Sequence, residues 1–217
     1  MKKNNIYFVS GIDTNIGKSY ATGFIARQWN EKGTRTITQK FIQTGNTTMS
    51  EDIELHRKIM GTGLLKEDIE GLTMPEIFTY PCSPHLAAEI DKREIDFEKI
   101  EKATVALSEI YDAVLVEGAG GLMVPLTRSK LTIDYIAEKK YPFIFVASGR
   151  LGSINHILLS LEAIKRRGIE LHTFVYNLFP ECDDKIIRED TRNYVRNIIS
   201  EEYPEAEFVE VPEISIP

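Results

Sequence analysis

Cysteine and long apolar runs are scarce in this sequence. Its two cysteines, Cys82 and Cys182, are far apart in the chain and neither belongs to a Cys-x-x-Cys pair, so neither a zinc site nor a disulfide framework is indicated. No apolar stretch approaches the ~20 residues of a membrane-spanning helix, and the run after Lys2 and Lys3 is too short for a signal peptide. We therefore expect a cytoplasmic protein with no membrane partner.

Positive charge is not in excess either. The chain has 26 Lys and Arg against 33 Asp and Glu, a formal net charge of −7, which argues against broad electrostatic binding to nucleic acid. A Gly-x-Ser-x-Gly elbow is also lacking, so serine hydrolase chemistry has no support. The 217 residues, 42% hydrophobic and 27% charged, are typical of a globular protein, and we expect one domain over 1–217.

The most informative stretch is Gly11-Ile12-Asp13-Thr14-Asn15-Ile16-Gly17-Lys18-Ser19. An apolar run at 5–10 precedes it and a helical pattern over 18–32 follows it, which is the strand, loop and helix arrangement of a phosphate-binding loop. Its first glycine lies one residue further from Gly17 than in the common pattern, and a chance glycine turn is the alternative. We expect nucleotide contacts at Thr14, Asn15, Ile16, Gly17, Lys18 and Ser19.

Strand and helix patterns alternate along the rest of the chain. Further strands are predicted at 34–40, 113–116, 143–147, 171–176 and 208–211. Further helices are predicted from Ser50, from near Pro84, over 96–110 and 132–139, from Ser153 to Gly168, and over 183–200; residues 61–83 are turn-rich and weakly patterned. This order predicts an α/β fold similar to that of P-loop NTPases, a mostly parallel sheet with helices on both faces.

Polar residues follow the predicted strands at the edge where ligands bind in such sheets. Lys40 ends the second strand, and Glu117 follows the apolar run 113–116. With Asp52 at a helix start and Ser19 in the loop, these residues offer hard oxygen ligands for Mg²⁺ and cations for a triphosphate. The alternatives are a solvated Lys40, an Asp52 that only favours the helix dipole, and a Glu117 that only forms a turn.

A second glycine-rich stretch follows Glu117. Gly118, Ala119 and Gly120 would allow the backbone to approach a ligand closely, so we include them among the expected nucleotide contacts. Asn177 follows the strand at 171–176, where it either starts a loop or recognises the base.

Together these residues resemble the dethiobiotin synthetase family. That family's loop reads Gly-Thr-Asp-Thr-x-Val-Gly-Lys-Thr, with the same longer glycine spacing. Lys40, Thr44 and Asp52 match further positions in order, and so do the stretches Pro81-Cys82-Ser83-Pro84-His85, Val116-Glu117-Gly118-Ala119-Gly120-Gly121 and Leu151-Gly152-Ser153-Ile154-Asn155-His156. The matches span nearly the whole chain.

The resemblance implies a reaction in which 7,8-diaminopelargonate, CO₂ and ATP give dethiobiotin, ADP and phosphate. It proceeds through a carbamate and a carbamic–phosphoric anhydride. Lys18 and Lys40 would be the catalytic cations, and Ser19, Asp52 and Glu117 would hold Mg²⁺. Thr44 would contact the diamine, and a homodimer would place Leu151, Gly152, Ser153 and Asn155 at its carboxylate.

The sequence departs from the family pattern at several positions. Ile12 and Ser19 stand where Thr is usual, Phe41 where Pro is usual, and Leu178 where Asp is frequent. Relatives commonly continue beyond the position of Pro217 with a segment that helps to hold adenine. We therefore expect weaker or less selective nucleotide binding than is usual for the family.

Two other classes share parts of this pattern. A P-loop switch ATPase of the partitioning type, acting as an interaction protein, would carry an extra lysine at the position of Asp13. A glutamine-dependent amidoligase would need a glutaminase domain, for which this length leaves no room. Diamine-dependent turnover distinguishes the ligase from both.

Overall fold

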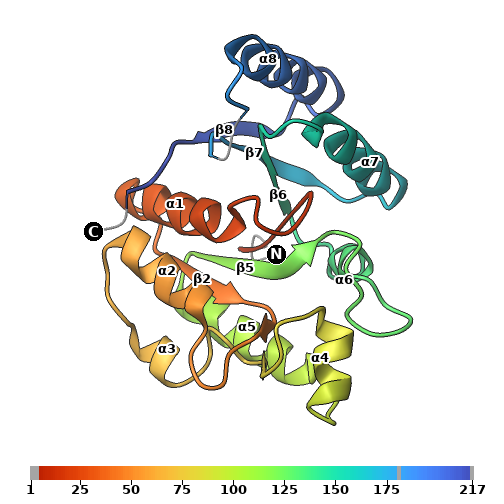
Figure 1. The fold of residues 1–217 in the computed structure, drawn as a ribbon. Coiled ribbons are helices and arrows are strands. Elements are labelled where there is room, and N and C mark those ends of the chain that lie inside the picture. The colour runs from red at the N-terminus through yellow and green to blue at the C-terminus, as the bar shows by residue number, and fades with distance from the viewer. Residues whose placement is uncertain (1–4, 180–181, 216–217) are drawn as a thin grey trace.

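The computed structural model describes residues 5–179 and 182–215, so Lys2, Lys3 and Pro217 lie outside the described residues. The main sheet is six-stranded within this part of the chain and parallel throughout (Figure 1). Its strands, in spatial order, are β2 (Thr36–Lys40), β5 (Ala113–Gly121), β1 (Ile6–Gly11), β6 (Phe143–Ser148), β7 (Leu171–Asn177) and β8 (Glu207–Val211).

Helices cover both faces of this sheet. They are α1 (Lys18–Glu31), α2 (Glu51–Met60), α3 (Lys66–Ile69), α4 (Pro84–Ile90), α5 (Phe97–Ile110), α6 (Thr132–Lys139), α7 (Ser153–Arg166) and α8 (Lys185–Glu202). Figure 1 shows α1 and α2 together on one side of β5, with α5 on the opposite side. The expected mostly parallel α/β fold is confirmed. Among the described helices, none has the length and apolar composition of a membrane span.

The strand order places β1 at the centre of the sheet. From β1 the chain crosses to β2 in one direction, whereas from β5 it crosses to β6 in the other, so right-handed crossovers put α1 and α6 on opposite faces. Such a reversal opens a crevice at the carboxyl ends of the strands, where ligands bind in open α/β sheets. The loop between β1 and α1 lies at this point. The large apolar side chains Phe8, Phe143, Phe145 and Phe174 are fully buried and fix the strands below it.

Two regions differ from the sequence-based expectations. β5 does not end at residue 116 but continues to Gly121, because its later residues pair with β1, as in Gly11 with Gly121. The weakly patterned stretch 61–83 contains α3 and a strand, β4 (Ile77–Phe78), which pairs with β3 (Gln43–Thr44); neither strand was predicted. Elements this short carry no periodicity to detect. The expectation of a single domain stays a prediction.

Candidate nucleotide and metal site

The loop between β1 and α1 closes tightly around Gly17. This residue is the N-cap of α1 and has a φ of 80°, in the left-handed region that favours glycine. A Cβ atom at Gly17 would lie 1.9 Å from the Asn177 Nδ2 atom, so a side chain does not fit there. Asn177 donates a hydrogen bond from Nδ2 to the Ile16 carbonyl oxygen (3.0 Å), which ties the loop to the end of β7. The first N–H groups of α1 therefore face the crevice, ready for an anion.

Lys18 is held at the mouth of this loop. Its side chain is buried, and its Nζ atom donates a hydrogen bond to the Asp13 carbonyl oxygen at 2.7 Å. Burial lowers the pKa of Lys18 to about 8, although the negative charge of Glu117 acts in the opposite direction. The loop's own backbone therefore keeps the lysine near the crevice. The neighbouring carboxylates offset only part of the effect of burial on its pKa.

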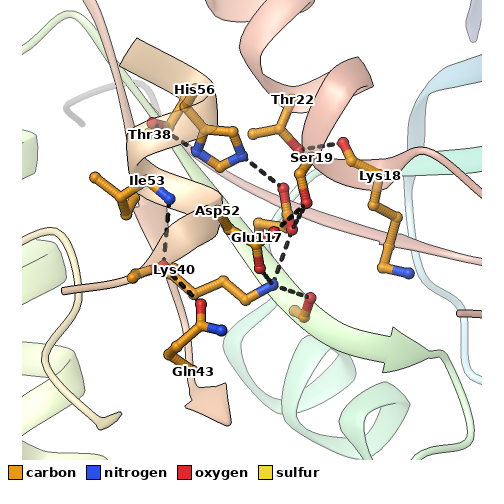
Figure 2. A network of polar contacts seen from close by, with 12 residues as sticks. Lys18, Ser19, Thr22, Thr38, Lys40, Gln43, Asp52, Ile53, His56 and Glu117 are labelled. Atoms are coloured by element: carbon orange, nitrogen blue, oxygen red, sulfur yellow. Dashed lines mark hydrogen bonds and ion pairs between the residues drawn. The ribbon is translucent and has the colours of Figure 1, made fainter. Parts of the chain in front are cut away.

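Lys40 and Glu117 meet across the β2–β5 ladder. They are register partners on the parallel strands, so their side chains leave the sheet on the same face. Lys40 Nζ lies 2.9 Å from Glu117 Oε1 and donates to the Gly118 carbonyl oxygen at 3.3 Å (Figure 2). Lys40 is 4% exposed and Glu117 is fully buried, which excludes both the solvated lysine and the simple turn residue considered above.

Asp52 and Ser19 complete the cluster from the two helices above. The Ser50 side chain caps α2 by accepting a hydrogen bond from Ile53 N, which places Asp52 in the first turn. Ser19 Oγ lies 2.6 Å from Asp52 Oδ1 and 2.9 Å from Glu117 Oε1, and Lys40 Nζ lies 2.6 Å from Asp52 Oδ2. Figure 2 shows Ser19, Lys40, Asp52 and Glu117 converging on one point.

The buried charges in this cluster stabilise one another's ionised forms. Burial alone would lower the pKa of Lys40, but Glu117 and Asp52 raise it above its ordinary value. Burial alone would raise the pKa of Glu117, but the charge of Lys40 and the contact with His56 lower it well below its ordinary value. At neutral pH the cluster therefore holds an ammonium group beside an ionised carboxylate.

The oxygen atoms of this cluster fit a small divalent cation. The Asp52 and Glu117 carboxylates both lie within hydrogen-bond distance of the Ser19 hydroxyl, and three such hard oxygen donors have the chemistry that Mg²⁺ prefers. No group of three or more His, Cys, Asp or Glu side chains suited to a metal occurs in the described part of the chain. Two acids and one hydroxyl beside a phosphate loop are typical of a cation that is shared with a nucleotide.

A cavity of about 560 Å³ opens over this cluster and the loop. Its walls contain most of the residues predicted from sequence, namely Thr14, Asn15, Gly17, Lys18, Ser19, Lys40, Thr44, Asp52, Glu117, Ala119, Gly120 and Asn177. Ile16 and Gly118 stand just outside the lining and contribute backbone carbonyl oxygens to Asn177 and Lys40.

The segment that was predicted to bind the substrate's carboxylate lies outside this cavity. Leu151, Gly152, Ser153 and Asn155 do not line this cavity; they form the start of α7, where Leu151 is 74% exposed and Ser153 is buried. Arg150, just before them, forms an ion pair with Asp13, so the segment is connected to the phosphate loop.

Some residues of the site were not anticipated from the sequence. Pro212, Glu213 and Ile214, after β8, reach the cavity wall. His56, which was not among the predicted site residues, contacts Glu117 directly. One signal was present: His56 lies four residues after Asp52, on the same face of α2.

The fold and this loop define the chain as a nucleotide-binding protein of the P-loop class. A family model described as "AAA domain" matches residues 5–215. Similar solved structures include chloroplast FtsY from Physcomitrella patens (TM-score 0.53, 14% identity, covering 100% of this chain and 61% of that one). They also include pNOB8 ParA bound to nonspecific DNA (TM-score 0.54, 13% identity, 95% and 80% covered). These likenesses concern the fold alone.

Much higher sequence similarity relates the chain to one group of enzymes. The ATP-dependent dethiobiotin synthetase BioD 2 of Pasteurella multocida is 46% identical over 97% of this chain and 99% of the relative. The BioD 2 protein of Haemophilus influenzae is 52% identical (85% and 96% covered), and the BioD protein of Chlorobaculum tepidum is 47% identical (99% and 87%). The chain belongs to the dethiobiotin synthetase family.

Proposed function

We propose that this protein closes 7,8-diaminopelargonate with CO₂ to form dethiobiotin, at the expense of ATP. The observation that carries the proposal is the convergence of Lys18, Lys40 and the Ser19–Asp52–Glu117 oxygens on one cavity, in a member of this family. A site that only held a nucleotide would have no need of a second buried lysine beside the metal-binding acids.

The chemistry requires two anions to approach each other. An amine of the substrate adds to CO₂ and loses a proton to form a carbamate, and a carbamate oxygen attacks the γ-phosphorus of ATP with ADP as the leaving group. The second amine then attacks the carbamoyl carbon, which closes the ring and releases phosphate and a proton. Lys18 and Lys40 lower the repulsion between carbamate and triphosphate, and the loop amides hold the phosphates in line.

Mg²⁺, held by Ser19, Asp52 and Glu117, would neutralise charge on the phosphate oxygens. Lys40 provides a positive charge beside both acids. This arrangement keeps Glu117 ionised and preorganised for the cation, so binding requires no deprotonation of that ligand.

We further assign the diamine to the Thr44 side of the cavity and its carboxylate to the start of α7 in a homodimer. Supporting this, Ser153 is buried with an Oγ atom that has no protein partner among the described residues, at the N-terminus of a 14-residue helix. Apolar side chains are exposed nearby, at Leu151, Leu158 and Leu159. Analytical ultracentrifugation of the wild-type chain and of Leu159→Lys tests the dimer: we expect the variant to dissociate, and a monomeric wild type would contradict it.

The reaction is tested by supplying diaminopelargonate, bicarbonate, Mg²⁺ and ATP and measuring dethiobiotin by mass spectrometry. We expect one dethiobiotin for each ATP hydrolysed, and no product when the diamine or bicarbonate is omitted. ATP hydrolysis that is indifferent to the diamine would instead support a switch ATPase of the partitioning type.

A further inference from the structure

We propose that His56 is a positioning residue for the Mg²⁺ site, where its Nε2–H group holds one oxygen of Glu117 so that the other faces Ser19 and Lys40. This inference rests on the nucleotide and metal binding assigned above and not on the identity of the acceptor substrate.

One helix places both contacts. Asp52 and His56 are four residues apart on α2 and therefore project from the same face, one turn from each other. Asp52 reaches the Lys40 end of the Lys40–Glu117 pair, and His56 reaches the Glu117 end (Figure 2). A single rigid element thus fixes both carboxylates relative to Ser19.

The two oxygens of Glu117 have different contacts. Oε1 lies 2.9 Å from both Ser19 Oγ and Lys40 Nζ, whereas Oε2 lies 2.9 Å from His56 Nε2. Because Glu117 and His56 are both fully buried, water does not replace this contact. Removing the imidazole would leave a charged oxygen without that donor and would free the carboxylate to rotate away from Ser19.

A series of buried hydrogen bonds determines which imidazole nitrogen of His56 carries the proton. Arg57 Nη1 donates a hydrogen bond to Thr38 Oγ1 (2.8 Å), which leaves the Thr38 hydroxyl proton available for His56 Nδ1 at 3.0 Å. His56 Nε2 then carries the ring proton, as it must to donate to a carboxylate. For a neutral imidazole, this arrangement favours the Nε2–H tautomer.

Arg57, at the far end of this series of hydrogen bonds, is also fixed in place. Arg57 is 1% exposed and donates from Nε and Nη2 to the two carboxylate oxygens of Asp68, each at 2.8 Å. Thr38 stands two residues before Lys40 on β2, so both leave the strand on the same side. The strand that presents Lys40 therefore also presents the group that orients His56. Metal sites depend on such supporting partners as well as on their ligands.

Two substitutions at one position separate positioning from packing. His56→Leu introduces an apolar side chain of similar bulk that cannot donate a hydrogen bond. His56→Gln retains an N–H donor that reaches the position of Nε2. Mg²⁺ should increase the affinity for ATP, and the quantity measured is the Mg²⁺ concentration that gives half of this increase. We expect this concentration to be about 10- to 100-fold higher in His56→Leu than in wild type. His56→Gln should recover most of that loss. Calorimetric titration of full-length protein with ATP at several Mg²⁺ concentrations, without diamine, measures both.

His172→Leu is the matched control. His172 Nδ1 lies 2.8 Å from Thr173 Oγ1, a similar histidine–threonine pair, but at the amino-terminal end of β7, where it packs on Tyr7. We expect its Mg²⁺ requirement to match that of the wild type. A normal Mg²⁺ requirement in His56→Gln together with an equally normal one in folded His56→Leu would overturn the proposal.

A spectroscopic measurement covers the case in which His56→Leu does not fold. ¹⁵N NMR of the wild type should show His56 protonated at Nε2 and not at Nδ1. Thr38→Val, which removes the hydroxyl at nearly constant volume, should shift the Nδ1 resonance and raise the Mg²⁺ requirement. A proton on Nδ1 alone, or a Thr38→Val variant with unchanged Nδ1 shift and Mg²⁺ requirement, would contradict the proposal. Because no measurement here involves turnover, failure of the ligase assignment would show separately, as absent dethiobiotin with intact Mg²⁺–ATP binding.

Discussion

Lys40 Nζ and Glu117 Oε1 lie 2.9 Å apart because β2 and β5 align the two residues as register partners in a parallel ladder. The pair is buried and shares its ammonium group with Asp52. Breaking a buried ion pair on one side leaves an uncompensated charge, which is far more costly than losing a surface pair. The site is therefore coupled to the stability of the sheet. A bound cation can supply part of the positive charge that Lys40 places beside the two carboxylates.

Replacing Lys40 with Met should separate catalysis from folding. Without the ammonium group, Glu117 and Asp52 repel each other, and we expect a loss of about 3–5 kcal/mol in the free energy of unfolding in EDTA. Added Mg²⁺ should raise the melting temperature of the variant more than that of the wild type, while turnover falls about 100-fold or more. Denaturation and turnover assays measure these effects. Lys102→Met, which removes an exposed pair with Glu98, serves as the control, and near-normal turnover in Lys40→Met would remove Lys40 from the mechanism.

Glu117→Gln should weaken Mg²⁺ binding at the site and with it the Mg²⁺-dependent activity. The amide is nearly isosteric but uncharged, and one of its ends must present N–H groups to Ser19, Lys40 or His56, which already supply donors. We expect the Mg²⁺ concentration for half-maximal activity to rise about tenfold or more. The measurement is a Mg²⁺ titration of the initial rate at saturating ATP. An unchanged requirement would show that Glu117 has a structural role only.

ATP affinity should fall as the pH rises above about 8. Burial lowers the pKa of Lys18 to about 8, so above this pH the ligand-free protein holds a neutral amine that must take up a proton to pair with phosphate. The dissociation constant should therefore be level below the pKa and increase by up to about tenfold per pH unit above it. Calorimetry in two buffers of different ionisation enthalpy should detect the proton uptake. Lys18→Arg, which stays charged, should bind without this uptake, and a level affinity from pH 7 to 9.5 in the wild type would contradict the prediction.

A methyl group at Gly17 should abolish nucleotide binding by a steric effect. Gly17→Ala places Cβ 1.9 Å from Asn177 Nδ2, so the loop must move away from the end of β7. Gly33→Ala is the matched control, because Gly33 also has a positive φ, of 88°, but no atom lies within 4 Å of the added Cβ. Both variants should lose about 1 kcal/mol of stability from backbone strain. Only Gly17→Ala should lose ATP binding, as measured by fluorescent-nucleotide titration; equal binding by both variants would show that the loop has room to adjust.

Local sequence patterns were sufficient for most of the fold. Apolar runs and helix signals near the predicted positions correspond to β1, β6, β7, α1, α5 and α7, because each has a strong periodicity or a clear start and stop. The short β3–β4 ladder was missed because it depends on pairing between distant segments, and the end of β5 was misplaced for the same reason. Glycines end a strand in isolation, but pairing to a neighbour extends it.

The sequence by itself determined the phosphate loop, the α/β alternation and the residue types that hold a cation and a triphosphate, because each depends on neighbours along the chain. Only the tertiary structure decided three relationships. Lys40 and Glu117 are register partners, Asn177 binds the loop beside Gly17, and His56 contacts Glu117. Those relationships depend on strand register and on the close packing of α2 over β2. The physical reason is that the contacts of a buried charge come from distant segments that meet only when the sheet has formed, and no local pattern encodes that meeting.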